Sequence, residues 1–516
     1  MKFDLIRLIR NLPFMLILFR PKSLNANIHK PVLNRIFSMV LVLFSIVLSN
    51  ISLSKQVTID TFDLNDIPTL TNKQTISLVA EKGFWTEHLK TELLPKFIKK
   101  TGIQVNLIPL PLEDMYSTQT HSLINGEGRY DLLTMEAGWS KEWASNGFTR
   151  PLNSLAREYD DKGVAGMQAH LAPFYTNLLQ ILSYKDKYHS IPYNNYTMGN
   201  HYRLDLFEHP EEQKAFLKHY GYALNPPTSI KNLIDVSRFF TRKQGERLAG
   251  KTLKHNFYGL TLMSGNKPHI NDEFSSMLWG LGGSWLRPNY NEMREIESFN
   301  VEANSDKAMD VARAYLSLLD FSVPGDENYA FLESANAIAN NQAAMWPFAY
   351  NNLWSISAQV EKKVPGAKLA VSTSPLGKPY TGAYAMAVAY DSKNPEAAYW
   401  LLKYITSFEG QLAYANGGGN PCRQDVVLLD KFAHKNYYPV SGAYQQNHQD
   451  NLAWNENVLN LGHFTSTAMG KIYPELMRTA YLIRSNQIAP AEALNQLQEK
   501  IFELQNLHGE VAAFKK

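Results

Sequence analysis

Apolar and polar residues alternate in two short stretches that flank a segment with helical spacing. Residues 75–80 (Thr-Ile-Ser-Leu-Val-Ala) and residues 103–107 both alternate as strands do. Between them, the apolar side chains of residues 85–100 fall on one helical face, where Gly102 supplies the stop and Pro95 is expected to kink or divide the helix. A strand, a helix and a strand in this order form a βαβ unit, so the pattern predicts an α/β fold with parallel strands.

Three later segments show the same helical periodicity. Residues 305–319 start at a capping serine, Ser305, and residues 394–408 start with Asn394-Pro395, which favours a helix N-terminus. Residues 490–505 repeat leucine and isoleucine at helical spacing. These apolar stripes predict helix faces that pack in the core.

Strand-like runs meet clusters of Pro, Asn and Gly at three places, residues 191–200, 375–385 and 416–425. The chain has 516 residues, 45% of them hydrophobic and 19% charged, which is enough for two or three globular domains. We therefore expect the chain to cross between domains at these clusters.

The charge is concentrated at the N-terminus. Residues 1–54 hold seven basic residues and one acidic residue. The rest of the chain therefore has 44 basic and 47 acidic residues, whereas the formal net charge of the whole chain is +3. An apolar run at residues 36–48 follows Lys30 and Arg35 and precedes Ser-Leu-Ser at 52–54, a pattern typical of a secretory signal peptide cleaved near Ser54. An uncleaved membrane anchor is the alternative. A second apolar run at 12–19 indicates either an extended n-region or a misassigned start codon.

The cysteine content bears on the compartment. Cys422 is the only cysteine, so no intramolecular disulfide forms, and no cysteine follows the apolar run to carry a lipid. We expect a soluble, exported protein in the bacterial periplasm. The balanced charge outside the leader and the lack of a basic block argue against a nucleic-acid partner.

One segment matches a phosphate-loop pattern. Residues 245–252 read G-x-x-x-x-G-K-T, but such a loop must follow a buried strand and open a helix. Here residues 238–244 read as the end of an amphipathic helix, and residues 253–256 lack helix character, so a surface loop is predicted. No H-E-x-x-H, G-x-S-x-G or cysteine pair is present, and we predict no catalytic residue, metal site or cofactor. Glycoside hydrolysis needs two carboxylates at a set distance in space, and the sequence leaves open whether the chain has such a pair.

Aromatic and amide residues gather near the expected crossings, at residues 192–196, 346–352 and 416–420. Aromatic rings pack on the C–H faces of sugars, and amides and carboxylates exchange hydrogen bonds with hydroxyl groups. This mixture suits a neutral polyol. Packing in the core is the alternative for each single aromatic ring.

Nine short motifs, in order, resemble those of the extracellular solute-binding proteins of bacterial ABC sugar importers, the family that includes maltose-binding protein. Residues 97–105 (Phe-Ile-Lys-Lys-Thr-Gly-Ile-Gln-Val) are similar to the family's F-x-K-x-T-G-I-x-V signature. The other matching segments are residues 80–85, 126–133, 191–207, 226–229, 279–286, 343–347, 393–398 and 417–423. In the third of these, Arg203-Leu204 replaces the usual Asn-Lys.

The resemblance implies a two-lobed periplasmic-binding-protein fold of type II, whose lobes close over a ligand about hinge strands. By this alignment, residues 1–54 are the signal peptide and residues 55–72 a polar linker. Lobe 1 comprises residues 73–195 and 382–430, and lobe 2 comprises residues 196–381 and 431–505. The family further implies a monomer that delivers its ligand to the membrane permease of an ABC transporter.

The resemblance also implies a set of ligand contacts at the strand ends. Hydrogen bonds with hydroxyl groups would come from Glu81, Glu136, Asp272 and Asn420, and stacking from Trp85, Trp139, Trp346 and Tyr350. The set is Glu81, Trp85, Glu136, Trp139, Tyr193, Asn194, Tyr196, Asn271, Asp272, Trp346, Tyr350, Gly382, Tyr384, Asn420 and Arg423.

Two of these positions need comment. Glu136 stands where many family members have Asp, and the chain is longer than most members, chiefly in the leader and over residues 425–468, so a standard maltodextrin pocket is not expected. Arg423 would orient an anionic ligand or pair with a buried acid.

The sequence thus predicts a receptor for a carbohydrate or polyol. An exported glycoside-active enzyme, or an accessory protein on the same fold, is the alternative, and a receptor kept for sensing without a permease is a third.

Overall fold

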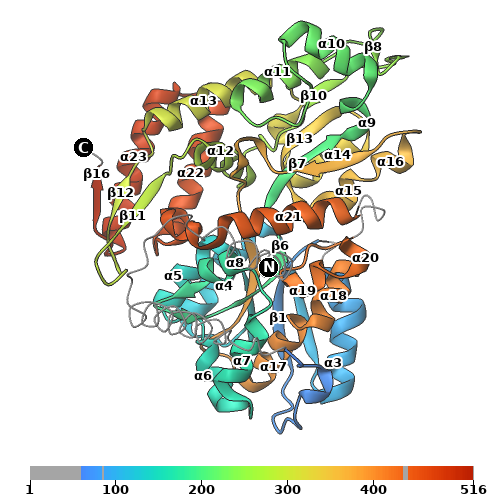
Figure 1. Cartoon of the computed structure of the whole chain (residues 1–516). Helices are drawn as coiled ribbons and strands as arrows, with labels where there is room; N and C mark the ends of the chain where they lie inside the picture. Colours follow the sequence, from blue (N-terminus) through green and yellow to red (C-terminus); the bar gives the residue numbers. More distant parts are fainter. Residues whose placement is uncertain (1–59, 84–85, 434–439, 515–516) are drawn as a thin grey trace, which may run out of the picture. The chain divides into compact units, whose positions relative to one another are not determined.

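Two sheets, each with its own helices, organise the chain in a computed structural model that describes residues 60–83, 86–433 and 440–514 (Figure 1). The first sheet has the strand order β2-β1-β3-β15-β6. Its strands are β1 (Ile76–Glu81), β2 (Val105–Leu110), β3 (Leu132–Met135), β6 (Ile191–Asn195) and β15 (Ala383–Val388). β1 is parallel to β2 and β3, as predicted, whereas β15 runs antiparallel to β3 and β6.

The second sheet has the order β10-β13-β7-β14. Its strands are β7 (Met198–Arg203), β10 (Tyr258–Leu260), β13 (Ala343–Tyr350) and β14 (Leu369–Ser372). All eight residues of β13 are buried, so helices or loops cover both faces of this strand. The two sheets are the centres of lobe 1 and lobe 2 of a two-lobed periplasmic-binding-protein fold.

Helices cover each sheet. Those of lobe 1 are α3 (Leu94–Thr101), α4 (Leu112–Asn125), α5 (Ser140–Ser145), α6 (Leu152–Tyr159), α7 (Gly163–Leu171), α8 (Thr176–Ile181), α17 (Pro395–Ile405), α18 (Phe408–Asn416) and α19 (Gln424–Val427). Those of lobe 2 are α9 (Leu204–Phe207), α10 (Pro210–Tyr220), α11 (Ile230–Phe240), α12 (His269–Gly280), α13 (Asp306–Leu319), α14 (Phe331–Ala339), α15 (Trp354–Ser357), α16 (Val360–Lys363), α22 (Met469–Arg484) and α23 (Pro490–Leu507).

The predicted βαβ unit is confirmed. A π-helical turn, η3 (Leu89–Leu93), leads into α3, and Pro95 lies in the first turn of α3, where its missing N–H costs no helical hydrogen bond. Gly102 ends the helix in the left-handed region, with φ of 72°. Pro95 therefore divides the segment as expected.

The three later helices are also confirmed. The Ser305 side chain accepts a hydrogen bond from the Ala308 amide and caps α13. The helix predicted to end at residue 408 stops instead at Ile405, because the Ser407 side chain caps α18 by accepting from the Gly410 amide at 3.1 Å.

The chain passes between the sheets where two of the three crossings are expected. β6 ends at Asn195 and β7 begins at Met198, and the return lies between β14 and β15. The third expected crossing stays beside lobe 1, because the Asn195 amide donates to the Asn420 carbonyl at 2.9 Å. After α20 (Asp430–Ala433), helix α21 (Val440–Trp454) contacts α8 of lobe 1 and β7 and β14 of lobe 2 (Figure 1).

The phosphate-loop pattern forms a surface hairpin, as predicted. β8 (Arg247–Leu248) pairs antiparallel with β9 (Lys251–Thr252), both residues of β9 are exposed, and no helix follows. Within the described ranges, no three or more His, Cys, Asp or Glu side chains are grouped to hold a metal ion.

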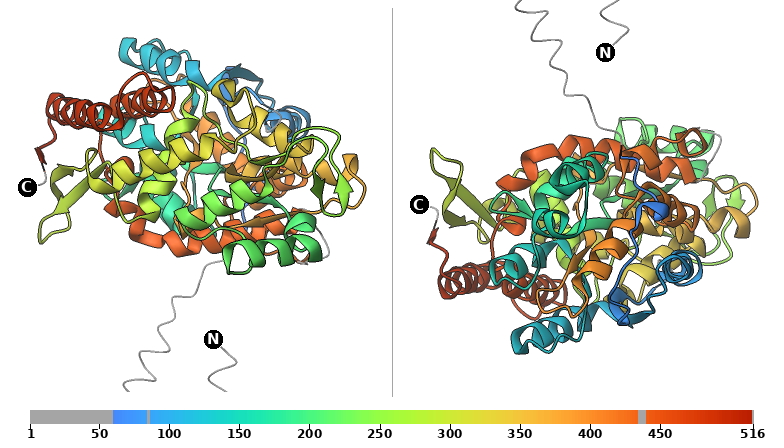
Figure 2. Two further views of the ribbon diagram at one scale, coloured as in Figure 1. Left: turned by 90° about the horizontal axis from the view of Figure 1, so that it is seen from above. Right: turned by 90° about the horizontal axis from the view of Figure 1, so that it is seen from below.

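The two ends of the described chain pack on opposite lobes. Phe62, Ile67 and Leu70 are buried in lobe 1 rather than forming the expected linker, and Phe62 stacks on Trp400 with ring centroids 6.0 Å apart. At the other end, β16 (Ala512–Phe514) pairs parallel with β12 (Ile296–Val301), next to β11 (Leu286–Tyr290), as both views of Figure 2 show. The sequence did not predict this sheet.

The predicted signal peptide lies outside the described residues. Among the helices that the structure does describe, none is long and apolar enough to cross a membrane.

Candidate ligand-binding site

Elements of both lobes line one cavity of about 40 Å³. This volume holds roughly three water molecules. The lining side chains are Glu81, Leu112, Glu136 and Tyr384 from lobe 1, Tyr196 from the first crossing, and His269, Asp272, Phe331, Tyr350, Asn352, Leu353 and Tyr473 from lobe 2. The lining is therefore aromatic and acidic.

Glu81 is the last residue of β1, at the carboxyl end of a parallel strand. It is only 2% exposed, and its Oε2 is buried without a hydrogen-bond partner. Burial raises the pKa of Glu81 to about 8, while a hydrogen bond from Tyr384 opposes the shift and the nearby charge of Glu113 adds to it. Glu81 thus favours its protonated form in the absence of a positive partner.

Glu136 follows β3 and caps the 3₁₀ turn η4 (Ala137–Trp139), where it accepts a hydrogen bond of 2.6 Å from the Gly138 amide. Its Oε1 also accepts a hydrogen bond from the Tyr196 hydroxyl. Burial raises the pKa of Glu136, and these hydrogen bonds partly offset the shift. The Tyr196 ring lies on the first crossing, so this bond ties lobe 1 to the connection between the lobes.

Asp272 lies in the first turn of α12 and accepts hydrogen bonds from two tyrosines. The Tyr473 hydroxyl donates to Oδ1 at 2.7 Å, and the Tyr350 hydroxyl donates to Oδ2. Burial raises the pKa of Asp272 well above its usual value despite both bonds. Next to it, burial lowers the pKa of His269 to about 3, so this imidazole is neutral at physiological pH.

The family profile described as bacterial extracellular solute-binding protein matches residues 82–412, more than half of the chain. The chain belongs to this family. A comparison with curated proteins found no match.

Solved structures of ABC transporter solute-binding proteins share the fold of this family member. One from Agrobacterium radiobacter K84, in complex with ribitol, is 18% identical with a TM-score of 0.65, over 85% of this chain and 100% of that chain. One from Agrobacterium vitis S4, with bound D-mannitol, is 17% identical with a TM-score of 0.64, over 84% and 99%. The maltose-bound MalE3 of T. maritima is 18% identical with a TM-score of 0.61, over 84% and 100%.

Of the ligand contacts expected in this solute-binding protein, the structure brings six together in the cavity lining: Glu81, Glu136, Tyr196, Asp272, Tyr350 and Tyr384. Trp85 lies outside the described residues. The other eight expected contacts lie outside the described lining.

Two expected stacking residues are part of the packing. Trp346 is fully buried with its ring edge against His201, and Trp139 packs against Tyr116 and Trp143.

Five further expected contacts also lie outside the lining. The Tyr193 ring packs against Tyr414, and Gly382 faces the Tyr196 ring. The three asparagines take part in buried amide contacts, in which Asn194 accepts from Asn352, Asn271 donates to Asp272 and Asn420 accepts from Asn447.

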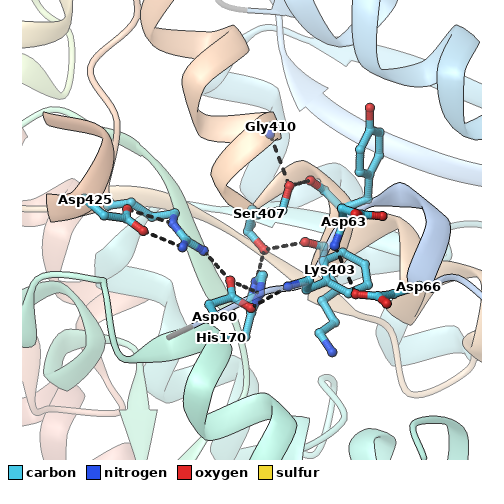
Figure 3. A network of polar contacts seen from close by, with 12 residues as sticks. Asp60, Asp63, Asp66, His170, Lys403, Ser407, Gly410 and Asp425 are labelled. Atoms are coloured by element: carbon cyan, nitrogen blue, oxygen red, sulfur yellow. Dashed lines mark hydrogen bonds and ion pairs between the residues drawn. The ribbon is translucent and has the colours of Figure 1, made fainter. Parts of the chain in front are cut away.

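Arg423 lies in a different network, which includes Asp60, His170 and Asp425 (Figure 3). Its guanidinium is fully buried and binds Asp60 at 2.8 Å and Asp425 at 2.7 Å. His170 Nδ1 lies 3.2 Å from the same Asp60 carboxylate. The contacts of Asp60 with His170 and Arg423 hold the pKa of the Asp60 carboxyl well below its usual range, although burial alone would raise it. Arg423 thus pairs with the buried Asp60 and the exposed Asp425 rather than facing the cavity.

Six lining residues were not anticipated. Asn352 ends the aromatic and amide stretch at residues 346–352 and Leu353 directly follows it, so this stretch was the signal for both. The others are Leu112, His269, Phe331 and Tyr473, and no sequence motif marks them.

Proposed function

We propose that this solute-binding protein is a periplasmic receptor that binds a small sugar or polyol between its lobes and delivers it to an ABC permease. The cavity lined by tyrosines and carboxylates from both lobes carries the proposal. Tyrosine rings offer apolar faces to the C–H groups of a sugar, and carboxylates bind its hydroxyl groups. The fold shared with ribitol-, mannitol- and maltose-bound proteins supports the same ligand class.

Ligand entry requires the lobes to separate, because the carboxyl side chains and most of the tyrosine side chains that line the cavity from both lobes are buried. The crossings between β6 and β7 and between β14 and β15 are the proposed hinges. At the rim, Lys267 and Glu113 from opposite lobes form an exposed ion pair of 3.5 Å, which opposes opening only weakly.

We propose no catalytic role for the carboxylates. Glycoside hydrolysis needs one carboxylate that stays ionised and one that stays protonated. In this cavity burial raises the pKa values of Glu81, Glu136 and Asp272 alike, and the described lining has no lysine or arginine that would keep one of them ionised. The chain is proposed to act as a monomer.

A thermal-shift screen tests the proposed function. The full chain would be expressed in a bacterium, recovered from the periplasm and screened against sugars and polyols. A saturable rise in melting temperature, with the ligand recovered unchanged, is expected, because a ligand that binds only the native state stabilises it. Consumption of a ligand, or no shift with any compound, would contradict the proposal. N-terminal sequencing of the same sample would show whether the chain begins near Lys55.

A further inference from the structure

The cavity offers hydrogen-bond acceptors and few free donors. Its described lining includes three carboxylates and no lysine or arginine. The tyrosine hydroxyl groups are already engaged, since Tyr196 donates to Glu136, and Tyr350 and Tyr473 donate to Asp272. A hydroxyl group of a neutral ligand both donates and accepts, whereas an ammonium group only donates. Because the lining has more free hydrogen-bond acceptors than free donors, it favours a ligand rich in hydrogen-bond donors.

One carboxyl oxygen of Glu81 lacks a partner, although Tyr384 hydrogen-bonds to the same carboxyl group. Its Oε2 is buried in the lining without a hydrogen bond, although the residue is only 2% exposed. A buried carboxylate of this kind is costly unless a positive group or further donors satisfy it. The structure therefore leaves one acceptor position open at the end of β1.

The charged groups around Glu81 do not fill this position. Glu113 of α4 adds negative charge, and Lys267, from the loop before α12, is paired with Glu113 at the rim. Tyr384 of β15 and Tyr193 of β6 are neutral, because burial and the Glu81 charge raise the pKa of both hydroxyl groups. His269 of α12 is neutral as well. The surroundings of Glu81 are thus neutral or negative on every described element that lines this side.

Aromatic rings complete the environment for a cation. Tyr196 meets Tyr350 and Tyr384 edge to face, with centroids 5.9 Å and 5.4 Å apart, so the three rings surround the cavity from the crossing, β13 and β15. Tyrosine faces attract cations, most strongly where water is excluded.

We propose that the ligand carries an ammonium group on a sugar or polyol frame, and that Glu81 holds this group among the tyrosine rings. The inference rests on the proposed receptor function and specifies its ligand. The neutral part of the ligand would meet Glu136 and Asp272. Because the free Glu81 carboxyl is largely protonated at neutral pH, ammonium binding would release about one proton to the buffer.

Matched ligand pairs test this inference by titration calorimetry on the exported full-length protein. The pairs are D-glucosamine with D-glucose, and 1-amino-1-deoxy-D-sorbitol with D-sorbitol. We expect the amine of at least one pair to bind at least tenfold more tightly than its neutral partner. Its binding enthalpy should differ between phosphate and Tris buffers in proportion to one released proton.

Two variants assign the effect to Glu81. Glu81→Gln keeps the shape but removes the charge, and is expected to lower amine affinity at least tenfold more than it lowers neutral-ligand affinity. The exposed Glu87→Gln is the matched control and should leave both affinities unchanged. Melting temperatures of both variants would report folding.

The outcomes separate the two proposals. If neutral members bind as tightly as the amines or more tightly, or if amine binding releases no proton, the ammonium inference is overturned and the receptor function stands. If no amine and no neutral sugar or polyol binds, the receptor function fails and the inference fails with it.

Discussion

The Tyr196 hydroxyl donates a hydrogen bond to Oε1 of Glu136 and so joins the first crossing to the carboxyl end of β3. Removing this donor with Tyr196→Phe leaves the buried Glu136 carboxylate with hydrogen bonds from the Gly138 and Ala137 backbone amides alone. We expect a loss of about 1 to 3 kcal/mol in the free energy of unfolding, measured with urea. Tyr184→Phe, on the surface hairpin of β4 (Ser183–Tyr184) and β5 (Lys187–Tyr188), is the control and should change stability little. Equal losses in both variants would contradict the role of this bond.

Gly382 allows the Tyr196 ring to take its place. A Cβ at position 382 would lie 2.5 to 2.7 Å from three atoms of the Tyr196 side chain. Gly382→Ala should therefore displace the ring, destabilise the protein by about 1 to 3 kcal/mol and weaken ligand binding. Gly417→Ala is a suitable control, because its φ is −76° and its Cβ would have no neighbour closer than 3.4 Å. The prediction fails if Gly382→Ala melts and binds as the native chain does.

The raised pKa of Glu81 makes stability depend on pH. The folded chain holds the Glu81 proton up to a pH of about 8, whereas the unfolded chain releases it near 4.5. The stabilising contribution is present below pH 4.5 and is lost as the pH rises toward 8. Glu81→Gln lacks this pH-dependent contribution. Between pH 4.5 and 8, the free energy of unfolding of the variant should therefore rise relative to that of the native chain by at most about 1.4 kcal/mol per pH unit. Urea unfolding at pH 5, 6, 7 and 8 measures the difference. A constant difference would show that Glu81 is ionised in the folded protein.

The pairing of Asp60 with Arg423 stabilises lobe 1. Asp60→Asn leaves the buried guanidinium with Asp425 alone, and a cost of about 3 kcal/mol at pH 7 is expected in urea unfolding. Because the pKa of Asp60 is lowered in the folded state, its contribution is present above pH 4 and is lost as the pH falls toward the lower folded value. The cost should therefore be smaller at pH 3.

The exposed Asp161→Asn is the control for this pair and should cost little at either pH. A similar cost in both variants at pH 7 would argue against a specific role of Asp60.

Local signals predicted the elements that local chemistry determines. Ser305 caps α13 because a serine oxygen satisfies a free amide wherever such a helix starts, and Pro95 begins α3 because proline lacks a donor. Glu81 and Glu136 reach the cavity because parallel strands present their carboxyl ends at one edge of a sheet. These features need only a short piece of chain.

The positions that sequence reasoning misplaced depend on tertiary structure. Trp346 and Tyr350 are an even number of residues apart in β13 and would share a face in a regular strand. The register of β13 against β7 shifts between Trp346 and Ala349, and only Tyr350 lines the cavity. Tyr473 reaches Asp272 because α22 packs on α12, which no periodicity within α22 reveals.

The Asp60 network closes lobe 1 across a long stretch of chain, because Asp60 and Arg423 are 363 positions apart. A polypeptide leaves the ribosome, or a membrane pore, with its N-terminus first. Asp60 is then among the first residues of the described chain to emerge, yet its partner arrives only after all of β1 to β15. Lobe 1 therefore completes this buried charge pairing only when nearly the whole chain has emerged.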